Sequence, residues 1–261
     1  MTELFNTVLY EPLFNLLMYF YKVIPGMDIG VAIIIVTIIT KIVLFWPSLS
    51  SIKSQKSMQE LQPKIDAVKK KYKDNKEQQS KELMNVYKEN KVNPFSSCLP
   101  LLIQLPILIA LFRVFMGGLN TDPETGILVA DQLNHLYSSL RDYFSINPIS
   151  PLLFNWVDLS KPFWVFALLA AAFQFWQSKM LMIRQQIPKT PGAKDEGMAA
   201  TMSKQMVYFM PLITFFFGLT FPAGLTLYWM MSTLFMVGQQ FYFLRRKNKV
   251  KPNEPEKQPA N

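Results

Sequence analysis

The sequence has little of the residue chemistry on which most hydrolases and metalloenzymes depend. Its 261 residues include one cysteine, Cys98, and one histidine, His135. A single cysteine excludes an intramolecular disulfide and a thiolate metal cage, and a single histidine excludes a two-histidine metal site. Charged residues make up only 17% of the chain, against about a quarter in soluble domains. The chain is therefore short of the polar surface that a soluble protein needs.

Apolar residues, which make up 50% of the sequence, occur in long blocks. The longest block runs from Met206 to Leu244, 39 residues without a charge. Because about 20 helical residues cross a bilayer, this block is long enough for two spans, with a turn at Phe221-Pro222-Ala223-Gly224. Three other blocks each fit one crossing. We therefore expect an all-α membrane protein with five transmembrane helices, at residues 29–47, 94–116, 162–183, 206–221 and 222–244.

The charges between these blocks predict the orientation. Residues 48–93 carry 11 basic and 6 acidic side chains, and residues 245–261 carry 6 and 2. Residues 184–205, taken with the adjacent Lys179, carry 5 and 2, whereas residues 117–161 carry 2 and 5. Loops rich in lysine and arginine stay in the cytoplasm. The pattern predicts an extracytoplasmic N-terminus, an extracytoplasmic loop at 117–161 and a cytoplasmic loop at 184–205. The basic tail at 245–261 is then cytoplasmic, and its composition predicts disorder.

Residues 1–28 are predicted to lie outside the first span. Within them, residues 13–24 are strongly apolar but short, and no basic region or small-residue cleavage site marks a signal peptide. Glu11, Asn15 and Lys22 fall on one face of a helix. We interpret this segment as an amphipathic helix in the plane of the outer membrane surface. A sixth span starting from the cytoplasm is the alternative.

Residues 48–93 are polar and rich in helix formers, with two sparse apolar stripes and a break near residues 73–75. This pattern predicts a cytoplasmic helical hairpin. Its lysines are explained either as a solvated surface or as a docking site for anionic lipid, ribosomal RNA or acidic proteins. The lysines proposed for docking are Lys64, Lys69, Lys70, Lys71, Lys73 and Lys76.

Lys41 is the one charge well inside a predicted span. Such residues usually face protein or water, although a lysine can also extend its ammonium to the membrane surface. Thr37 lies on the same helix face as Lys41. The other spans carry polar residues at similar depths: Ser97, Gln104, Gln174, Gln177, Thr226 and Thr233. Each is explained either by interhelical hydrogen bonding or by a shared polar cavity.

No aspartate or glutamate occurs in the five predicted spans. This absence argues against an aspartyl intramembrane protease and against a carboxylate proton relay. A Ser/Lys membrane hydrolase stays possible, because a desolvated lysine can act as a base. A small-solute transporter is the other alternative, but the inverted repeats and paired intramembrane charges typical of that class are not visible.

Several sequence runs resemble the YidC/Oxa/Alb membrane protein insertases. They are LQPKI at residues 61–65, Asn93-Pro94, CLPLLIQLPI at residues 98–107 and FPAGLTLYW at residues 221–229. The resemblance extends from about Ile29 to Arg246, in the order that the family shows.

The resemblance implies a fold and a function. Five core helices would enclose a hydrophilic groove open to the cytoplasm and to lipid, with an in-plane helix before the first span. Lys41 falls where the family carries a functionally important arginine, and Tyr228 and Trp229 join the groove residues named above. The groove would receive nascent membrane proteins. The hairpin and tail would contact the ribosome and the signal recognition or translocon machinery. The family implies a bacterial plasma-membrane location, and no cofactor, metal or nucleotide is expected.

Overall fold

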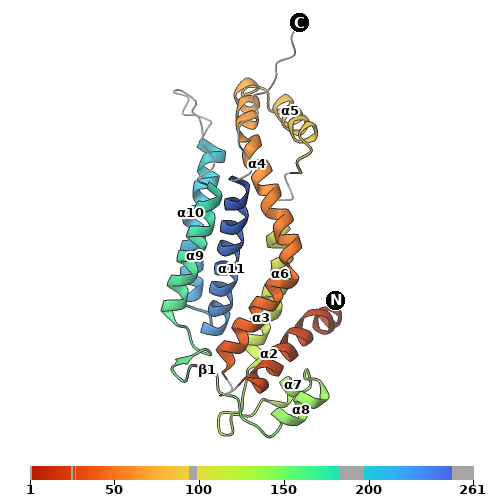
Figure 1. Cartoon of the computed structure of the whole chain (residues 1–261), viewed down its shortest axis with the longest axis vertical. Coiled ribbons are helices and arrows are strands. Elements are labelled where there is room, and N and C mark those ends of the chain that lie inside the picture. Colours follow the sequence, from red (N-terminus) through yellow and green to blue (C-terminus); the bar gives the residue numbers. More distant parts are fainter. Residues whose placement is uncertain (1, 25, 27, 94–98, 183–196, 249–261) are drawn as a thin grey trace.

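The computed structural model describes residues 2–24, 26, 28–93, 99–182 and 197–248, most of which are helical. Long helices run along the main axis of the molecule, with α4 and α5 at one end and α7 and α8 at the other (Figure 1). The elements are α1 (Thr2–Phe5), η1 (Asn6–Tyr10), α2 (Glu11–Val23), α3 (Ile29–Val43), α4 (Phe45–Lys71), α5 (Lys76–Glu89), α6 (Leu99–Arg113), η3 (Val114–Gly118), α7 (Ala130–Leu133), α8 (Ser138–Phe144), β1 (Leu152–Leu153), β2 (Val157–Asp158), α9 (Trp164–Met182), α10 (Gly197–Gly218) and α11 (Ala223–Asn248).

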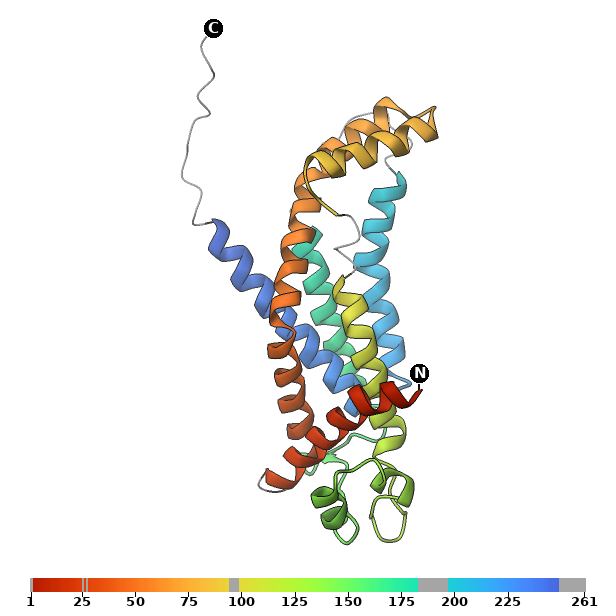
Figure 2. The same cartoon turned by 90° about the vertical axis from the view of Figure 1, so that its right-hand side faces the viewer.

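The N-terminal arm is a chain of three short helical segments that crosses the other helices obliquely near one end (Figure 2). α2 has Pro12 in its first turn, where the missing N–H costs no helical hydrogen bond. α2 ends at Val23, and Gly26 then takes a φ of 83°. Glycine adopts this left-handed conformation without steric strain, so the chain can turn sharply before α3.

A sharp bend separates α3 from α4. The axis of α3 differs by 64° from that of Phe45–Met58, the first part of α4. Pro47 supplies a physical reason: in a continuous helix its ring would collide with the carbonyl of Val43, and it has no N–H to bond that carbonyl. The first span predicted at residues 29–47 therefore contains a break, which the hydropathy pattern does not predict.

The described helices were compared with the length and hydropathy that a membrane crossing requires. Among the described residues no single helix meets both requirements. The bent pair of α3 with Phe45–Met58 of α4 meets them together. Leu102–Gly117 and Val207–Gly218 form shorter apolar helices. The five spans remain predictions from the sequence.

α9, α10 and α11 pack together, and α3 packs against α11 (Figure 1). Two glycines, one in α10 and one in α11, allow their helices to approach neighbouring helices closely. A Cβ on Gly218 of α10 would lie 2.7 Å from the Cβ of Ala167 in α9. A Cβ on Gly224 of α11 would lie 2.9 Å from a ring carbon of Phe115. These short spacings let α10 pack closely on α9 and α11 pack closely on η3. α10 begins at Gly197, inside the loop predicted for residues 184–205.

α4 and α5 form a helical hairpin at one end of the molecule (Figure 2). α4 ends at Lys71 and α5 begins at Lys76, so the turn contains residues 73–75, where the sequence predicts a break. The Asn75 side chain caps α5 by accepting a hydrogen bond from the Gln78 N–H, 3.0 Å away. α5 has no buried residue. Among the described residues the buried apolar side chains of the hairpin therefore belong to α4, and they include Leu61 and Ile65.

The opposite end holds the loop between η3 and α9, with α7, α8 and the antiparallel pair β1–β2. This loop contributes to the hydrophobic core through Leu136, Leu140 and Phe144. The Phe144 ring stacks on Tyr21 of α2, with centroids 6.0 Å apart. The loop is therefore packed onto the N-terminal arm.

Candidate functional site: a buried polar chain between helices

Lys41 lies in the last turn of α3 and is only 7% exposed. Its Nζ donates a hydrogen bond to Oε1 of Gln104 in α6, 2.8 Å away. The Gln104 amide nitrogen in turn donates to the hydroxyl of Tyr228 in α11. Three helices that are far apart in the sequence are thus joined by one chain of hydrogen bonds, which we call the Lys41 chain.

The partner of Lys41 in the Lys41 chain is a neutral amide, which the sequence pattern does not predict. The carbonyl end of the amide accepts from the ammonium while its NH₂ end donates to the phenol, so Gln104 serves both neighbours. Within the described residues Lys41 forms no ion pair. Its positive charge is held in place without being neutralised.

The predicted threonines are buried but do not join the Lys41 chain. The Thr37 hydroxyl donates to the Ile33 carbonyl at 2.7 Å, and Thr233 donates to the Trp229 carbonyl at 2.8 Å. Thr226 makes the same kind of bond over 3.4 Å to the carbonyl four residues earlier. Threonine commonly satisfies its hydroxyl on its own helix in this way. Trp229 is half-buried.

The polar residues of α9 contact other helices. Gln174 accepts a hydrogen bond from Thr214 of α10, and Gln177 donates to the sulfur of Met236 in α11 at 3.6 Å. These bonds join α9 to α10 and α11. The predicted groove residues of α9 therefore form contacts of their own, separate from the Lys41 chain. Ser97 lies outside the described residues.

A second polar contact, between residues that are not among the predicted groove residues, lies beside the bend. Ser48 of α4 donates to Oε1 of Gln239 in α11 at 2.8 Å, and Nε2 of Gln239 lies 3.5 Å from the Phe45 carbonyl oxygen. The amide thus bonds a side chain and a backbone carbonyl of the first turn of α4. The feature of the sequence that could have indicated this contact is the presence of polar residues within the uncharged block at residues 206–244. Within the described residues the hydrogen-bond partner found for the Lys41 ammonium is Gln104.

The predicted docking lysines lie on α4, on α5 and in the turn between them, at the end of the molecule remote from β1, α7 and α8 (Figure 2). Most of them are exposed. Lys64 donates to Oδ1 of Asn90 at 2.9 Å and so links the two helices of the hairpin. Lys71 lies over the Tyr72 ring at 5.1 Å. The hairpin therefore presents a group of solvent-accessible positive charges.

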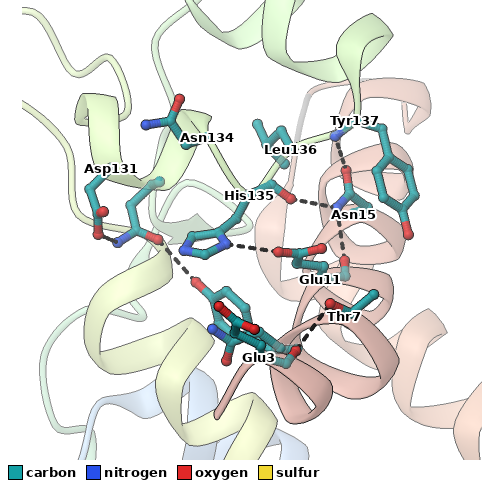
Figure 3. A network of polar contacts seen from close by, with 12 residues as sticks. Glu3, Thr7, Glu11, Asn15, Asp131, Asn134, His135, Leu136 and Tyr137 are labelled. Atoms are coloured by element: carbon teal, nitrogen blue, oxygen red, sulfur yellow. Dashed lines mark hydrogen bonds and ion pairs between the residues drawn. The ribbon is translucent and has the colours of Figure 1, made fainter.

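The polar face of α2 contacts the loop that carries α7. Figure 3 shows Glu11 and Asn15 pointing at the loop that carries α7, rather than away from the protein. Asn15 is 3% exposed and bonds both the carbonyl of His135 and the N–H of Tyr137, at 2.8 and 2.7 Å. His135 Nδ1 lies 3.1 Å from Oε1 of Glu11, and because a carboxylate only accepts, Nδ1 carries the proton. At Glu11 and Asn15 the polar face of α2 is therefore covered by this loop, and the in-plane position of the helix stays a prediction.

A tyrosine next to α2 completes this contact. Tyr10 donates through its hydroxyl to Gln132 in α7 at 3.0 Å, and its ring meets His135 edge-on. Burial, and then the Asp131 carboxylate, raise the pKa of Tyr10 to about 12. Tyr10 is therefore a neutral hydrogen-bond donor at physiological pH.

The fold and the Lys41 chain define a mostly helical protein in which a buried lysine is held between helices of apolar sequence. The model of a family described as 60Kd inner membrane protein matches residues 19–251. The chain belongs to this family, which confirms the resemblance found in the sequence.

Two curated relatives illustrate the likeness. The membrane protein insertase YidC of Fusobacterium nucleatum is 34% identical over 219 residues, which cover 84% of this chain and 87% of the relative. The membrane protein insertase YidC of Pelobacter propionicus is 36% identical over 246 residues, which cover 93% of this chain and 39% of the relative. The chain thus spans about two fifths of the length of several relatives that it matches.

A solved structure shares the fold. It is described as an active YidC insertase crystal structure with the first transmembrane domain resolved. The two align with a TM-score of 0.54 at 26% identity, over 89% of this chain and 46% of the other.

Proposed function

We propose that this chain is a bacterial inner-membrane insertase and chaperone, which moves short polar segments of nascent membrane proteins across the bilayer and helps their helices fold. The observation that carries the proposal is the Lys41 chain: a buried cation, held by a neutral amide between three helices and not neutralised by an acid within the described residues. Membership of the family and the likeness to YidC relatives support the same function.

The physical chemistry of the step agrees with this role. A polar segment in hydrocarbon loses the water that satisfies its backbone and charged groups, so its passage is costly. A cation inside the helical assembly attracts acidic segments and lowers this cost. The substrate's apolar helix then leaves into lipid, where burial of apolar surface supplies the driving force. This cycle needs no nucleotide and breaks no covalent bond.

In the proposed arrangement the five predicted spans surround a hydrophilic groove that contains Lys41 and opens to the cytoplasm. The N-terminus lies outside and the C-terminus inside. The hairpin of α4 and α5 would dock the ribosome or the targeting and translocon machinery through its exposed lysines. Their opposite charge to nucleic acid and to acidic proteins supports this assignment.

Insertion into liposomes that contain only this protein tests the proposal. Two single-span substrates are compared, one with an acidic translocated tail and one with a neutral tail. We expect Lys41→Ala to impair the acidic substrate more than the neutral one, and Lys41→Arg to retain both activities. Lys81→Ala, which removes an exposed lysine of α5, is the matched control. Equal activity of Lys41→Ala on both tails would contradict the role of the charge. Failure of the unmodified protein to insert either substrate would contradict the proposed function.

A further inference from the structure

The turn between β1 and β2 carries aromatic residues where turn-forming residues are expected. Leu153 pairs with Val157, and the Trp156 N–H bonds the Leu153 carbonyl at 3.0 Å. The two residues inside this bond, Phe154 and Asn155, have φ values of 50° and 57°. Turns of this kind favour asparagine and glycine, and a bulky residue with positive φ is uncommon. The turn geometry does not explain a phenylalanine at position 154.

The aromatic side chains of this turn are also exposed. Phe154 is 72% exposed and Trp156 is 81% exposed. Large aromatic residues usually bury most of their surface. Two neighbouring aromatic side chains that project from one turn are therefore a candidate interaction surface.

The strands below the turn are firmly seated, so the exposure does not come from a loose loop. Leu153 and Val157 belong to the buried hydrophobic core. The Phe154 N–H donates to Asp28 Oδ2 at 2.5 Å, and the other oxygen of Asp28 caps the N-terminus of α3. Gly30 leaves room for the Leu153 side chain, because a Cβ on Gly30 would lie 2.4 Å from Leu153 Cδ1. The turn is thus fixed to the start of α3.

The turn lies beside the start of α9. The Trp156 ring meets the Phe163 ring edge-on at 6.2 Å, and Phe163 meets Phe166 at 5.0 Å. Trp164, the first residue of α9, is 60% exposed. Leu168 follows one helical turn later on the same face and is also exposed. Trp164 and Leu168 are thus exposed apolar residues at the start of α9, the third predicted span, and they lie next to Phe163, which the turn contacts through Trp156.

The start of α11 also lies near the turn between β1 and β2, because it is hydrogen-bonded to the residues that follow β2. The Gly224 N–H bonds the carbonyl of Leu159, and the Ala223 N–H bonds the carbonyl of Lys161, at 3.0 and 2.9 Å. β1 lies at this end of the molecule in Figure 1, as do α2 and the start of α3. The aromatic turn is therefore placed where three predicted spans begin, and not at the tip of an extended loop.

We propose that residues 152–158 form an aromatic anchor that places Phe154 and Trp156 in the headgroup region of the outer leaflet and fixes the level of α9 in the bilayer. This inference rests on the proposed membrane arrangement. Tryptophan favours the membrane–water interface, because its ring is apolar and its N–H stays hydrogen-bonded. The exposed Trp164 and Leu168 at the start of α9, next to the Phe163 ring that Trp156 contacts, favour lipid over a protein partner. The exposed Lys161, paired with Asp158 at 2.9 Å, lies where it can also meet lipid phosphates.

A nitroxide at the turn tests the anchor. Asn155→Cys is introduced together with Cys98→Ser, labelled, and reconstituted with lipid alone in vesicles of phosphatidylcholine and phosphatidylglycerol. Collision of the nitroxide with oxygen, which concentrates in lipid, is compared with collision with a water-soluble nickel complex. We expect the label at position 155 to favour oxygen, and a label at the exposed Glu124 of the same loop to favour nickel. Equal, water-like behaviour at both positions would overturn the anchor. A turn that binds a protein instead of lipid would give this same result, because the vesicles contain lipid alone.

Two further variants separate the side chains from the fold. Phe154→Asn and Trp156→Thr together suit the turn and the strand but remove the aromatic surface. We expect this pair to move the label at position 155 toward nickel without lowering the thermal unfolding midpoint. An unchanged label environment would overturn the anchor.

A label at Leu168 reports whether α9 lies in the bilayer at all. Water-like behaviour there would overturn both the membrane arrangement and the anchor. Substrate insertion is measured on the same vesicles. If the label at position 155 lies in the interface but no substrate is inserted, the proposed function fails and the anchor stands.

Discussion

The Lys41 ammonium and the Gln104 amide oxygen, 63 positions apart in the chain, are joined by a hydrogen bond of 2.8 Å between α3 and α6. A glutamine partner has a consequence that a carboxylate would not have. It satisfies the geometry of the ammonium without cancelling its charge, so the attraction for an acidic segment is preserved. The amide also bonds Tyr228, which couples the position of Lys41 to α11.

The first prediction concerns this pair. Gln104→Leu leaves the buried ammonium and the Tyr228 hydroxyl without their partner, and a lost partner of this kind costs about 1–3 kcal/mol. We expect a lower free energy of unfolding in Gln104→Leu, measured by denaturant titration in detergent. Replacement of both residues, as Lys41→Met with Gln104→Leu, should recover part of the loss, because an apolar pair leaves fewer unsatisfied groups. If the loss of unfolding free energy in the double variant equals the sum of the losses in Lys41→Met and Gln104→Leu, the two side chains are not coupled.

Much of the helical framework could be predicted from the sequence. The apolar blocks correspond to α3, α6, α9, α10 and α11, and the break near residues 73–75 lies between α4 and α5. These features follow from local composition and turn residues. The partner of Lys41 could not be predicted, because it depends on how α3 and α6 are rotated against each other.

The polar face of α2 shows a second limit of the sequence. Periodicity identifies the face that carries Glu11 and Asn15, but not what covers it. A loop more than a hundred residues later supplies the partners, through His135 and Tyr137.

The bend before Pro47 is a third feature that the sequence does not determine. From the sequence alone, a proline in the first turn of a helix cannot be distinguished from a proline that breaks a helix. The positions of the neighbouring helices decide between the two.

The second prediction concerns the bend. Pro47→Ala restores an N–H that can bond the Val43 carbonyl and removes the ring that would collide with it. We expect α3 and α4 to straighten. Spin labels at Ile38 and Lys70, both exposed, would then move apart by about 4 Å for full straightening, at a rise of 1.5 Å per residue. Ser57→Ala, in the regular part of α4, is the control. An unchanged distance in Pro47→Ala would show that packing against α11, including the Ser48–Gln239 bond, sets the bend.

The third prediction uses the titration of Tyr10. Its pKa is raised from 10.0 to about 12, mainly by burial, with contributions from Asp131 and Glu11 that outweigh the opposing Arg113. The unfolded state releases the phenolic proton at lower pH than the folded state. The stabilisation is therefore complete below pH 10 and is lost as the pH rises toward 12. We expect thermal stability to fall more steeply across this window in the unmodified protein than in Tyr10→Phe. Parallel pH profiles would contradict a raised pKa at Tyr10.

The fourth prediction concerns the hairpin. Lys70, Lys71 and Lys76 are exposed, whereas Lys64 bonds Asn90 and holds the hairpin together. Changing the three exposed lysines to glutamine should weaken co-sedimentation with ribosomes at low salt and reduce its salt dependence, since fewer phosphate contacts release fewer counterions. The helical content should stay unchanged, because these side chains face solvent. Lys64→Gln is the contrasting variant. It should loosen α5, seen as faster hydrogen exchange, and lower ribosome binding less than the triple variant. If the triple variant binds ribosomes as the unmodified protein does, the lysines serve only as a solvated surface, and docking must involve another part of the molecule.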